Sequence, residues 1–482
     1  MARFIEDRRD ASLFVMGSLE NLLPRESVAR DIAAALASLD FSAFEAAYRN
    51  DATGRPALDP RQLAGVWVLG LLRGLTSSVA LAQRCHEDVE LRWLLGDAPV
   101  EKSTLCEFRK RHLEALKTLS TQVLAAMARS GLLPSEDLVM DGTIIRAAAS
   151  CEANVTRKRL KKRLERLEGV IAEKLEAEDA EAPSLEPLKR RKARLESAVE
   201  EMTALGLTKE EDRLTLTEPE ASLKKLKKGA FGPAHNVQVV SDPVSGAIVT
   251  VTVVDQANDQ GQLEPQVEGA LEELARVARL VEDLPGAAPV TVSRVGADGA
   301  YHDTLQLKNL AEHGVAAVVP NGQALRRAPG VTAGFEAEAF IHDPATDTLT
   351  CPQGQRLLRA GFNGGQTAAR YRATARTCAT CACKAGCCPK AQARGRTVHR
   401  PLYPEVVEAV AKRVESPEGK ALLRARSVTC EGNFARFVER LHWRRCRTWG
   451  QAGAWAEGLW RQITHNLMLL TGCWEPLVLK AA

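Results

Sequence analysis

The chain has 482 residues, enough for roughly three domains of about 150 residues each or for one core with large insertions. Apolar residues make up 45% of it and charged residues 26%, a balance that excludes global disorder. Its 65 lysines and arginines against 61 acidic residues give a net charge of only +4. Composition alone therefore does not identify a nucleic-acid-binding protein, and any basic surface must come from local clustering.

Signals for secretion or membrane insertion are not found in the sequence. The first ten residues contain no apolar stretch of signal-peptide length. No window approaches the roughly 18 consecutive apolar residues of a membrane-spanning helix. Six of the twelve cysteines lie between Cys351 and Cys388. Clustered cysteines without a secretory signal favour metal binding in a reducing compartment, so we expect a cytoplasmic protein that has no membrane partner.

Residues 1–130 are predicted to form a helical domain. Apolar residues recur at helical spacing over Val28–Leu39 and Leu63–Leu75, and Pro60 is placed to open the second helix. Ser103 is the expected N-cap of a further helix. That helix carries a cationic cluster of Arg109, Lys110, Arg111 and His112. A solvated helix face is the more common reason for such a cluster, and DNA contact is the alternative.

Strand-like segments begin after this domain. A buried strand is predicted around residues 138–145, where Asp141-Gly142 interrupts an apolar run. The later strands are predicted at Asn236–Val240, Ala247–Val254, Val290–Ala297 and Val315–Val319. The later helices are predicted at Gln262–Leu280, Thr304–Glu312, Pro404–Val414, Gly419–Arg440 and Ala454–Leu470.

Three strands followed by alternating helices and strands are the element order of an RNase H-like fold. We therefore predict an α/β protein with a mixed five-stranded sheet and flanking helices. This core is divided among residues 131–156, 229–342 and 401–482.

Two insertions are predicted to interrupt the core. The first, residues 157–228, is highly charged and contains two apolar stripes at helical spacing, which predicts a helical hairpin. One stripe consists of Leu160, Leu164, Leu167, Ile171 and Leu175, and the other of Leu188, Leu195, Val199 and Met202. Pro183 and Pro187 are expected to separate the helices, and a lysine cluster at 224–228 to close the hairpin. Such a hairpin is available to pack on a partner subunit or on DNA.

The second insertion, residues 343–400, holds the cysteine cluster. Cys378 and Cys381 have the spacing of one knuckle of a tetrahedral zinc site. The predicted ligands are Cys351, Cys378, Cys381 and Cys387. The remaining candidates are Cys383, Cys388, His342 and His399. A structural Zn²⁺ would hold together a small zinc-ribbon-like subdomain with too few apolar residues to fold alone, and the alternative is a set of reduced cysteines without metal.

Three acidic residues fall where an RNase H-like core places its metal ligands. Asp141 lies on the first strand, Asp298 closes the fourth strand, and Glu431 lies in a late helix. Cleavage of a phosphodiester by two Mg²⁺ ions, about 3.5–4 Å apart, needs a few carboxylates that converge on one point. Asp-Gly is also a common tight-turn dipeptide, and a single helical Glu is usually solvated. The coincidence of all three positions with the predicted strand order favours a metal site.

The segments around these acids resemble known sequence blocks. Residues 140–143 (MDGT), 296–301 (GADGAY) and 430–434 (CEGNF) resemble the three blocks of bacterial insertion-sequence transposases of the DDE type. Residues 236–238 (NVQ) and 465–467 (HNL) resemble further blocks of that family. The segments at 54–60 and 103–112 resemble the helical domain that precedes the catalytic core in one large subgroup. The resemblance covers nearly the whole chain apart from the hairpin insertion.

The resemblance implies a function and a set of catalytic residues. Asp141, Asp298 and Glu431 are implied to bind two Mg²⁺ or Mn²⁺ ions. The implied enzyme is a DNA transposase that hydrolyses a phosphodiester at the transposon ends and transfers the strand into target DNA. Its implied partners are double-stranded DNA, with the terminal inverted repeats bound by residues 1–130, and a second copy of the chain. The alternative is an inactivated or domesticated relative that binds DNA without catalysis.

Arginines near the acids are predicted to contact DNA. Arg436, Arg440 and Arg444 recur every four residues and are predicted to form one helix stripe beyond Glu431, and arginine can bind phosphate with two hydrogen bonds. A solvated helix explains this stripe equally well. The full predicted DNA-binding set is Arg109, Arg111, Arg424, Arg426, Arg436, Arg440 and Arg444. Four tryptophans are predicted to be core rather than base-stacking residues: Trp443, Trp449, Trp455 and Trp460.

Overall fold

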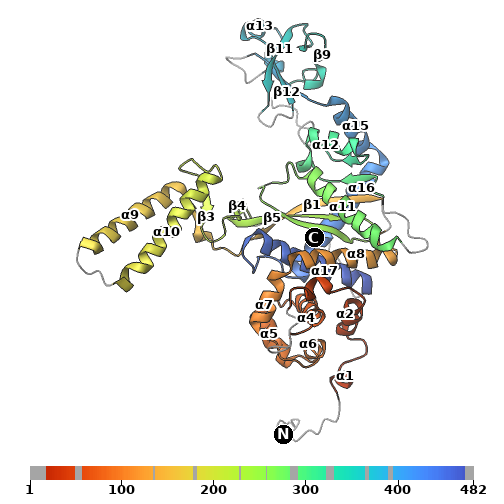
Figure 1. The fold of residues 1–482 in the computed structure, drawn as a ribbon. Helices are drawn as coiled ribbons and strands as arrows, with labels where there is room; N and C mark the ends of the chain where they lie inside the picture. The colour runs from red at the N-terminus through yellow and green to blue at the C-terminus, as the bar shows by residue number, and fades with distance from the viewer. Residues whose placement is uncertain are drawn as a thin grey trace, which may run out of the picture.

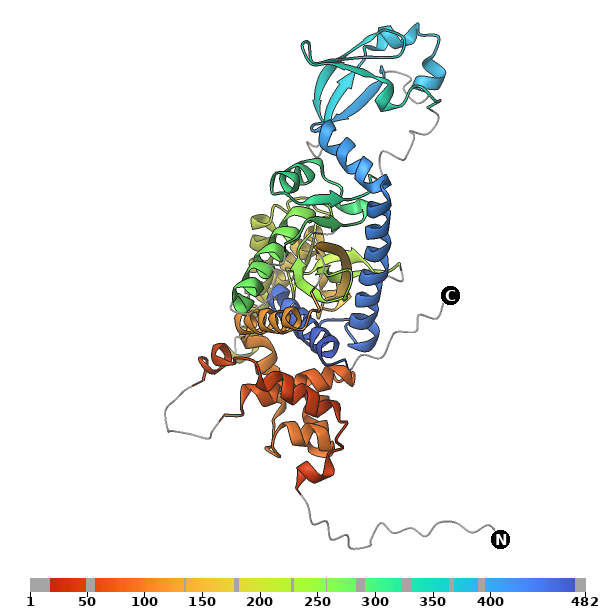
Figure 2. The same cartoon turned by 90° about the vertical axis from the view of Figure 1, so that its right-hand side faces the viewer.

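The computed structural model describes residues 18–48, 57–133, 136–176, 182–226, 229–256, 258–282, 291–321, 331–363, 368–388 and 395–472. A helical region lies at one end, an α/β layer in the middle, and a smaller β-sheet at the other end (Figures 1 and 2). A two-helix arm projects sideways from the middle (Figure 1). Within these ranges, no helix is both long and apolar enough to cross a membrane.

The N-terminal region is helical, as predicted. Its helices are α1 (Leu19–Leu22), α2 (Val28–Ala37), α3 (Ser42–Glu45), α4 (Pro60–Leu72), α5 (Ser78–Glu87), α6 (Val89–Leu94), α7 (Lys102–Arg111) and α8 (Leu113–Arg129). Pro60 opens α4, and the Asp59 carboxylate accepts a hydrogen bond from the Arg61 N–H. The prediction of Ser103 as an N-cap is wrong, because α7 already begins at Lys102.

The central sheet contains the five predicted strands. They are β1 (Asp137–Arg146), β5 (Phe231–Ser241), β6 (Ile248–Val254), β7 (Arg294–Gly296) and β8 (Ala316–Val318). Their spatial order is β6-β5-β1-β7-β8. The pairs β6–β5 and β5–β1 are antiparallel, whereas β1–β7 and β7–β8 are parallel, so the sheet is mixed.

Helices cover both faces of this sheet. On one face, α11 (Leu263–Val281) and α12 (Thr304–Glu312) pack against a cluster that includes Leu138 and Met140. On the other face, α16 (Pro417–Ala435) and α17 (Gly450–Thr471) pack against a cluster that includes Val139 and Val239. Consecutive residues of β1 are therefore buried on opposite sides, as expected for a central strand. Helix α17 also packs on α4 and α8 and so joins the helical region to the sheet.

A sixth strand, β4 (Ser222–Lys225), pairs with the first residues of β5. The prediction of five strands missed it, because its two lysines resemble the charged end of a hairpin. In the fold, Lys225 is exposed, whereas Lys224 is buried and its ammonium contacts the hydroxyl of Ser222. Successive residues of a strand point to opposite faces, which explains why Lys224 is buried and Lys225 is exposed.

The buried Lys224 makes stability depend on pH. Burial lowers the pKa of Lys224 from its usual 10.5 to about 8, and the charge of Asp255 opposes this shift only in part. Lys224 therefore destabilises the fold below pH 8, and the cost disappears as the pH rises towards 10.5. We expect Lys224→Met to raise the free energy of unfolding by roughly 2–3 kcal/mol at pH 7 and by much less at pH 10, measured by urea denaturation. Lys225→Met is the control, and equal gains for Lys224→Met at both pH values would contradict this explanation.

The arm is the predicted helical hairpin. It consists of α9 (Arg157–Glu176) and α10 (Ala182–Ala204), and the short pair β2 (Asn154–Thr156) and β3 (Arg213–Thr215) forms its base. Both predicted apolar stripes contribute to one separate core, which contains Leu160, Leu167, Leu195 and Met202. The prediction that Pro183 and Pro187 separate the helices is wrong, because they are the second and sixth residues of α10. At the sixth position, the missing N–H of Pro187 removes one backbone hydrogen bond from α10.

The cysteine-rich insertion forms a five-stranded antiparallel sheet. Its strands are β9 (Ile341–Asp343), β10 (Thr348–Thr350), β11 (Arg356–Phe362), β12 (Ala368–Arg372) and β13 (Thr397–Pro401), and it carries the short helices α13 (Ala375–Ala379) and α14 (Lys384–Cys387). A core that includes Leu349, Leu357 and Tyr371 lies inside it. The insertion therefore has a small apolar core, which cross-strand pairs supply. Helix α15 (Pro404–Glu415) leads back to the central layer (Figure 2).

The predicted arginine stripe beyond α16 does not form. Helix α16 ends at Ala435, a π-helical turn covers Arg436–Arg440, and His442 has a positive φ of 52°. The backbone turns there because Trp443 is fully buried and packs edge-to-face on Phe437. The prediction of core tryptophans is confirmed for Trp443 and Trp460, whereas Trp449 is exposed.

Candidate active site

Two of the predicted acids meet at the middle of the central sheet. In the parallel pair β1–β7, Val139 lies opposite Gly296. Asp141 and Asp298 each follow two residues later, so the register places them level with each other and on the same face. Asp298 also starts a short 3₁₀ turn, because its Oδ1 accepts a hydrogen bond from the Ala300 N–H at 2.8 Å. The Asp-Gly pair at 298 therefore forms a turn and also places Asp298 level with Asp141.

One cation joins these two aspartates. The Nη2 atom of Arg426 lies 2.7 Å from Oδ2 of Asp141 and 3.6 Å from Oδ2 of Asp298. Arg426 projects from α16, which packs over this face of the sheet. The close approach of α16 requires Gly296, because an added Cβ there would lie 3.1 Å from Cγ of Leu422. The fold therefore brings two carboxylates within reach of a single positive charge.

Burial changes the acidity of Asp141. It raises the pKa of Asp141 from 3.8 to about 6, and the charges of Asp298 and Asp259 add to this effect. The Arg426 charge and the Gly142 N–H act in the opposite direction but do not cancel it. A buried carboxylate among other acids is stabilised by any cation that approaches it, so this position favours cation binding.

The third predicted acid, Glu431, does not join the pair directly. It is exposed on α16, and its Oε1 accepts a hydrogen bond from Ser427 at 3.0 Å. The preceding residue, Cys430, is buried, and burial with the nearby charges of Asp141, Asp298 and Glu431 raises the pKa of its thiol to about 12. The charges of Asp141, Asp298 and Glu431 therefore all raise the pKa of the same thiol, that of Cys430. Over the described ranges, however, no three His, Cys, Asp or Glu side chains converge closely enough to hold a metal ion.

A fourth acid, Asp259, was not predicted. Its charge also acts on Asp141, but it lies against Gly142, which faces the opposite side of β1 from Asp141. The Oδ1 atom of Asp259 accepts hydrogen bonds from Nε2 of Gln238 at 2.7 Å and from Nδ2 of Asn236 at 3.1 Å. Gln238 in turn accepts a hydrogen bond from the buried hydroxyl of Tyr301. The NVQ segment was a usable signal, since it places two amides on one face of a buried strand. Their partner could not be found from sequence, because it lies in the loop after β6.

Close packing around Gly142 holds Asp259 in place. An added Cβ at Gly142 would lie 2.6 Å from Nε2 of Gln238 and even closer to Oδ1 of Asp259. We expect Gly142→Ala to lower the free energy of unfolding by about 1–3 kcal/mol, measured by urea denaturation. The cost should be smaller in an Asp259→Ala background. Gly169→Ala, in an open position of α9, is the control and should be neutral or stabilising. An unchanged stability of Gly142→Ala would contradict the close packing.

The predicted DNA-binding arginines differ in exposure. The prediction for Arg109 is wrong, because it is buried, stacks 4.8 Å from the centre of the Trp67 ring and donates to the Thr76 carbonyl at 2.9 Å. Arg426 is bound to the aspartates, and Arg436 is half-buried beside Asn433. The others are exposed: Arg111, Arg424, Arg440 and Arg444. Of these, Arg111 pairs with Glu107 and Arg444 with Glu439.

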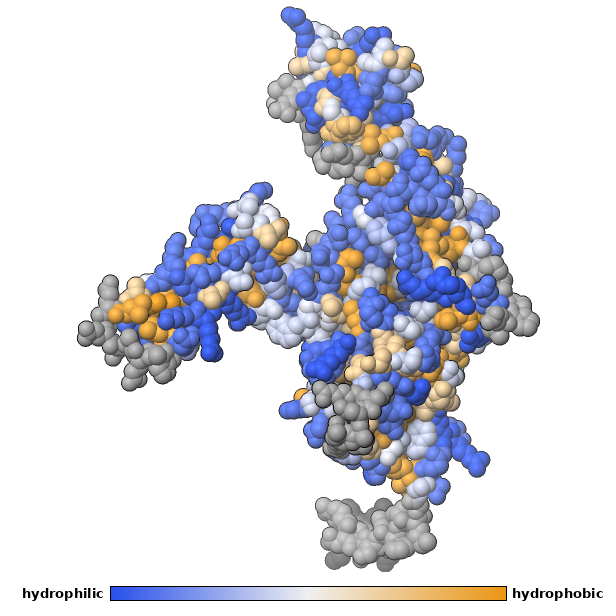
Figure 3. Space-filling view, viewed as in Figure 1, coloured by the Kyte–Doolittle hydropathy of each residue, from blue (hydrophilic) through white to orange (hydrophobic). Residues whose placement is uncertain are grey.

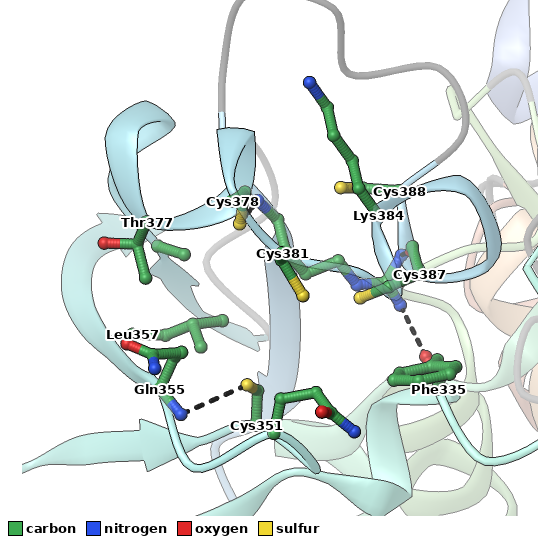
Figure 4. Close-up of a pocket in the computed structure, with 13 residues that line it drawn as sticks. Phe335, Cys351, Gln355, Leu357, Thr377, Cys378, Cys381, Lys384, Cys387 and Cys388 are labelled. Carbon is green, nitrogen blue, oxygen red and sulfur yellow. Dashed lines mark hydrogen bonds between the residues drawn. The ribbon is translucent and has the colours of Figure 1, made fainter.

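The predicted zinc ligands surround one cavity at the tip of the five-stranded sheet. Figure 4 shows Cys351, Cys378, Cys381 and Cys387 around this cavity, which Cys388 also lines. Burial raises the pKa of the Cys387 thiol to about 11, and the charges of three other cysteines act on it. Backbone N–H groups of Gln355 and Arg396 donate to the sulfurs of Cys351 and Cys378 at 3.3 and 3.4 Å. Such donors stabilise a thiolate, so the residues fit a zinc ion even though their sulfurs do not yet converge.

Two protein-family models match the chain. Residues 17–111 match a Transposase domain (DUF772), and residues 350–471 match a Transposase DDE domain. These matches confirm the resemblance to insertion-sequence transposases of the DDE type. The second match includes the cysteine cluster and Glu431, whereas Asp141 and Asp298 lie between the two matched segments. A comparison with curated proteins and one with solved structures found no match.

Proposed function

We propose that the chain is a DNA transposase with an RNase H-like core, which cleaves a phosphodiester at the transposon ends and joins the freed strand to target DNA. The observation that carries this proposal is the pair of aspartates on adjacent parallel strands, which share one cation in a chain matched by two transposase family models. The sheet order β6-β5-β1-β7-β8 supports the RNase H-like assignment.

The proposed metal ligands are Asp141, Asp298 and Glu431. Carboxylate oxygens are the ligands that Mg²⁺ prefers, and Asp141 and Asp298 already share a cation, so this pair fits. Mg²⁺ or Mn²⁺ ions bound there would activate the attacking oxygen and stabilise the leaving oxygen. Arg426 lies between the two carboxylates, so it would have to withdraw for a metal ion to be held there. A turn of the Glu431 side chain away from Ser427 would complete the set.

Substrate binding is assigned to exposed residues of the same layer. Arg424, Arg440 and Arg444 lie on or just beyond α16, and arginine binds phosphate oxygens through paired N–H groups. Arg111 is the corresponding candidate in the helical region, which we propose binds the terminal repeats. Two transposon ends must be held together for strand transfer, so we propose that the chain acts as a homodimer on double-stranded DNA.

The test is strand nicking of a duplex that carries a transposon end, with and without Mg²⁺. We expect Mg²⁺-dependent nicking by the wild-type chain. Arg426 between the aspartates and the outward position of Glu431 favour a second candidate, a DNA-binding relative without catalysis. That candidate predicts salt-dependent binding of the ends and no nicking under any divalent ion, and this result would reject the enzyme assignment.

We also propose a structural Zn²⁺ held by Cys351, Cys378, Cys381 and Cys387. The purified chain should contain one zinc ion per polypeptide, measured by elemental analysis, and Cys378→Ser should lose it. Cys383→Ser is the matched control, because Cys383 does not line the cavity. Equal zinc contents in the two variants, or a wild-type chain without zinc, would contradict this site.

A further inference from the structure

The α9–α10 arm has a core of its own and a strongly charged surface. Its apolar stripes face each other, so the remaining positions of both helices are directed to solvent. The arm stands away from the central layer, and its visible surface is mostly hydrophilic (Figures 1 and 3). Residues 157–166 include seven lysines and arginines and only one acidic residue, Glu165. Five more cations follow between residues 189 and 194 without any acid.

Most of this positive charge is not neutralised within the described residues. Lys158 pairs with Glu210, and Lys192 pairs with Glu168 and Glu196. Eight exposed cations of the arm make no ion pair with any described residue: Arg159, Lys161, Lys162, Arg166, Lys189, Arg190, Arg191 and Arg194. In a chain with a net charge of only +4, this is a local concentration of unpaired positive charge.

The spacing of these cations gives each helix a charged outer face. In α9, Arg159, Lys162 and Arg166 recur at three and four residues, opposite the buried Leu160 and Leu167. In α10, Arg190 and Arg194 are four residues apart and lie away from Leu195. Because the two helices pack against each other, these faces belong to one rigid element.

The geometry points to this arm as a clamp for the sugar–phosphate backbone of double-stranded DNA. The unpaired cations on the outer faces of α9 and α10 repel one another. A polyanion as long as the arm would remove this repulsion along the whole charged surface. The outer-face cations of α9 are three and four residues apart, which is about 4.5–6 Å along the helix, whereas one DNA strand presents a phosphate roughly every 3.4 Å along its axis. A duplex backbone therefore offers a phosphate within reach of each of these cations. A contact of this kind is independent of sequence. The inference extends the proposed function by assigning the arm to the DNA that flanks the catalytic layer.

The test compares two quadruple variants that remove the same charge. The arm variant carries Lys162→Gln, Arg166→Gln, Arg190→Gln and Arg194→Gln. The control variant carries Lys117→Gln, Arg276→Gln, Lys308→Gln and Lys412→Gln, four cations that pair with acids of their own helices. Binding of a fluorescent 40-base-pair duplex is measured by anisotropy from low to high salt, after circular dichroism has shown that both variants are folded.

We expect the four substitutions of the arm variant to lower the slope of log K against log salt by about 3.6, since each lost phosphate contact removes roughly 0.9. The control variant should keep the wild-type slope. A wild-type slope in the arm variant would overturn the inference, and loss of the dimer in sedimentation with unchanged DNA binding would assign the arm to a protein partner instead. Nicking is measured separately from DNA binding. If the wild-type chain does not nick DNA but the arm variant still shows a reduced slope, DNA binding by the arm is supported and only the proposed catalysis is rejected.

Discussion

Asp141→Asn is expected to abolish Mg²⁺-dependent nicking. The substitution preserves the size of the side chain but removes the negative charge that the proposed metal ions require. A bound metal contributes several kcal/mol of transition-state stabilisation, so its loss lowers the nicking rate on the order of 1,000-fold. The rate is measured under single-turnover conditions on an end-containing duplex.

The same substitution is expected to stabilise the metal-free protein. Burial holds the pKa of Asp141 at about 6, above its usual 3.8, so the ionised form destabilises the fold at neutral pH. This cost is fully present above pH 6, decreases as the pH falls from 6 towards 3.8, and is absent below 3.8, where the carboxyl is protonated in both states. In EDTA at pH 7.5, Asp141→Asn should raise the free energy of unfolding by on the order of 2 kcal/mol.

Two results bear on this prediction. Asp303→Asn is the control for nicking, since asparagine can still cap α12 and the residue lies outside the proposed metal site. Full nicking by Asp141→Asn would reject the active site. A less stable Asp141→Asn variant in EDTA would show that the ion pair with Arg426 outweighs the cost of burial.

The second large effect is expected at Glu431. Glu431→Gln should lower the nicking rate about 100- to 1,000-fold, because it removes the third proposed metal ligand. Its stability should change by less than about 0.5 kcal/mol, since the side chain is exposed. Glu418→Gln is the matched control, because Glu418 is an exposed acid of the same helix, α16, and within the described residues forms no ion pair with the arginines assigned to DNA. Both rates come from the nicking assay.

A comparison of the nicking rates of Glu431→Gln and Asp259→Asn decides which acid is the third metal ligand. Asp259 is held against Gly142 by Gln238 and Asn236, and its charge acts on Asp141, whereas Glu431 must turn inward. Undiminished nicking by Glu431→Gln together with loss of nicking in Asp259→Asn would transfer the third role to Asp259. Loss of nicking in Glu431→Gln alone would support the assignment made from the sequence motifs.

Much of the architecture could be predicted from local patterns. Apolar spacing located the helices at 28–37 and 304–312 and both stripes of the arm. Runs of β-branched residues located β5 and β6. The errors occurred where long-range contacts outweigh local preference. Lys224 is a strand residue because it pairs with β5, and the helix at Arg436 ends because Trp443 must be buried.

The sequence by itself determined the order of strands and helices, the positions of Asp141 and Asp298 at strand sites, and the resemblance to transposases, because each of these depends on neighbouring residues or short motifs. Tertiary packing alone decided that Arg426 joins the two aspartates, that Asp259 packs against Gly142, that Glu431 points outward and that Arg109 is buried. These features depend on how α16 and the loop after β6 meet the sheet. The contacts of Arg426 join residues more than a hundred positions apart, and those of Arg109 join residues more than thirty positions apart. No local pattern encodes such distances.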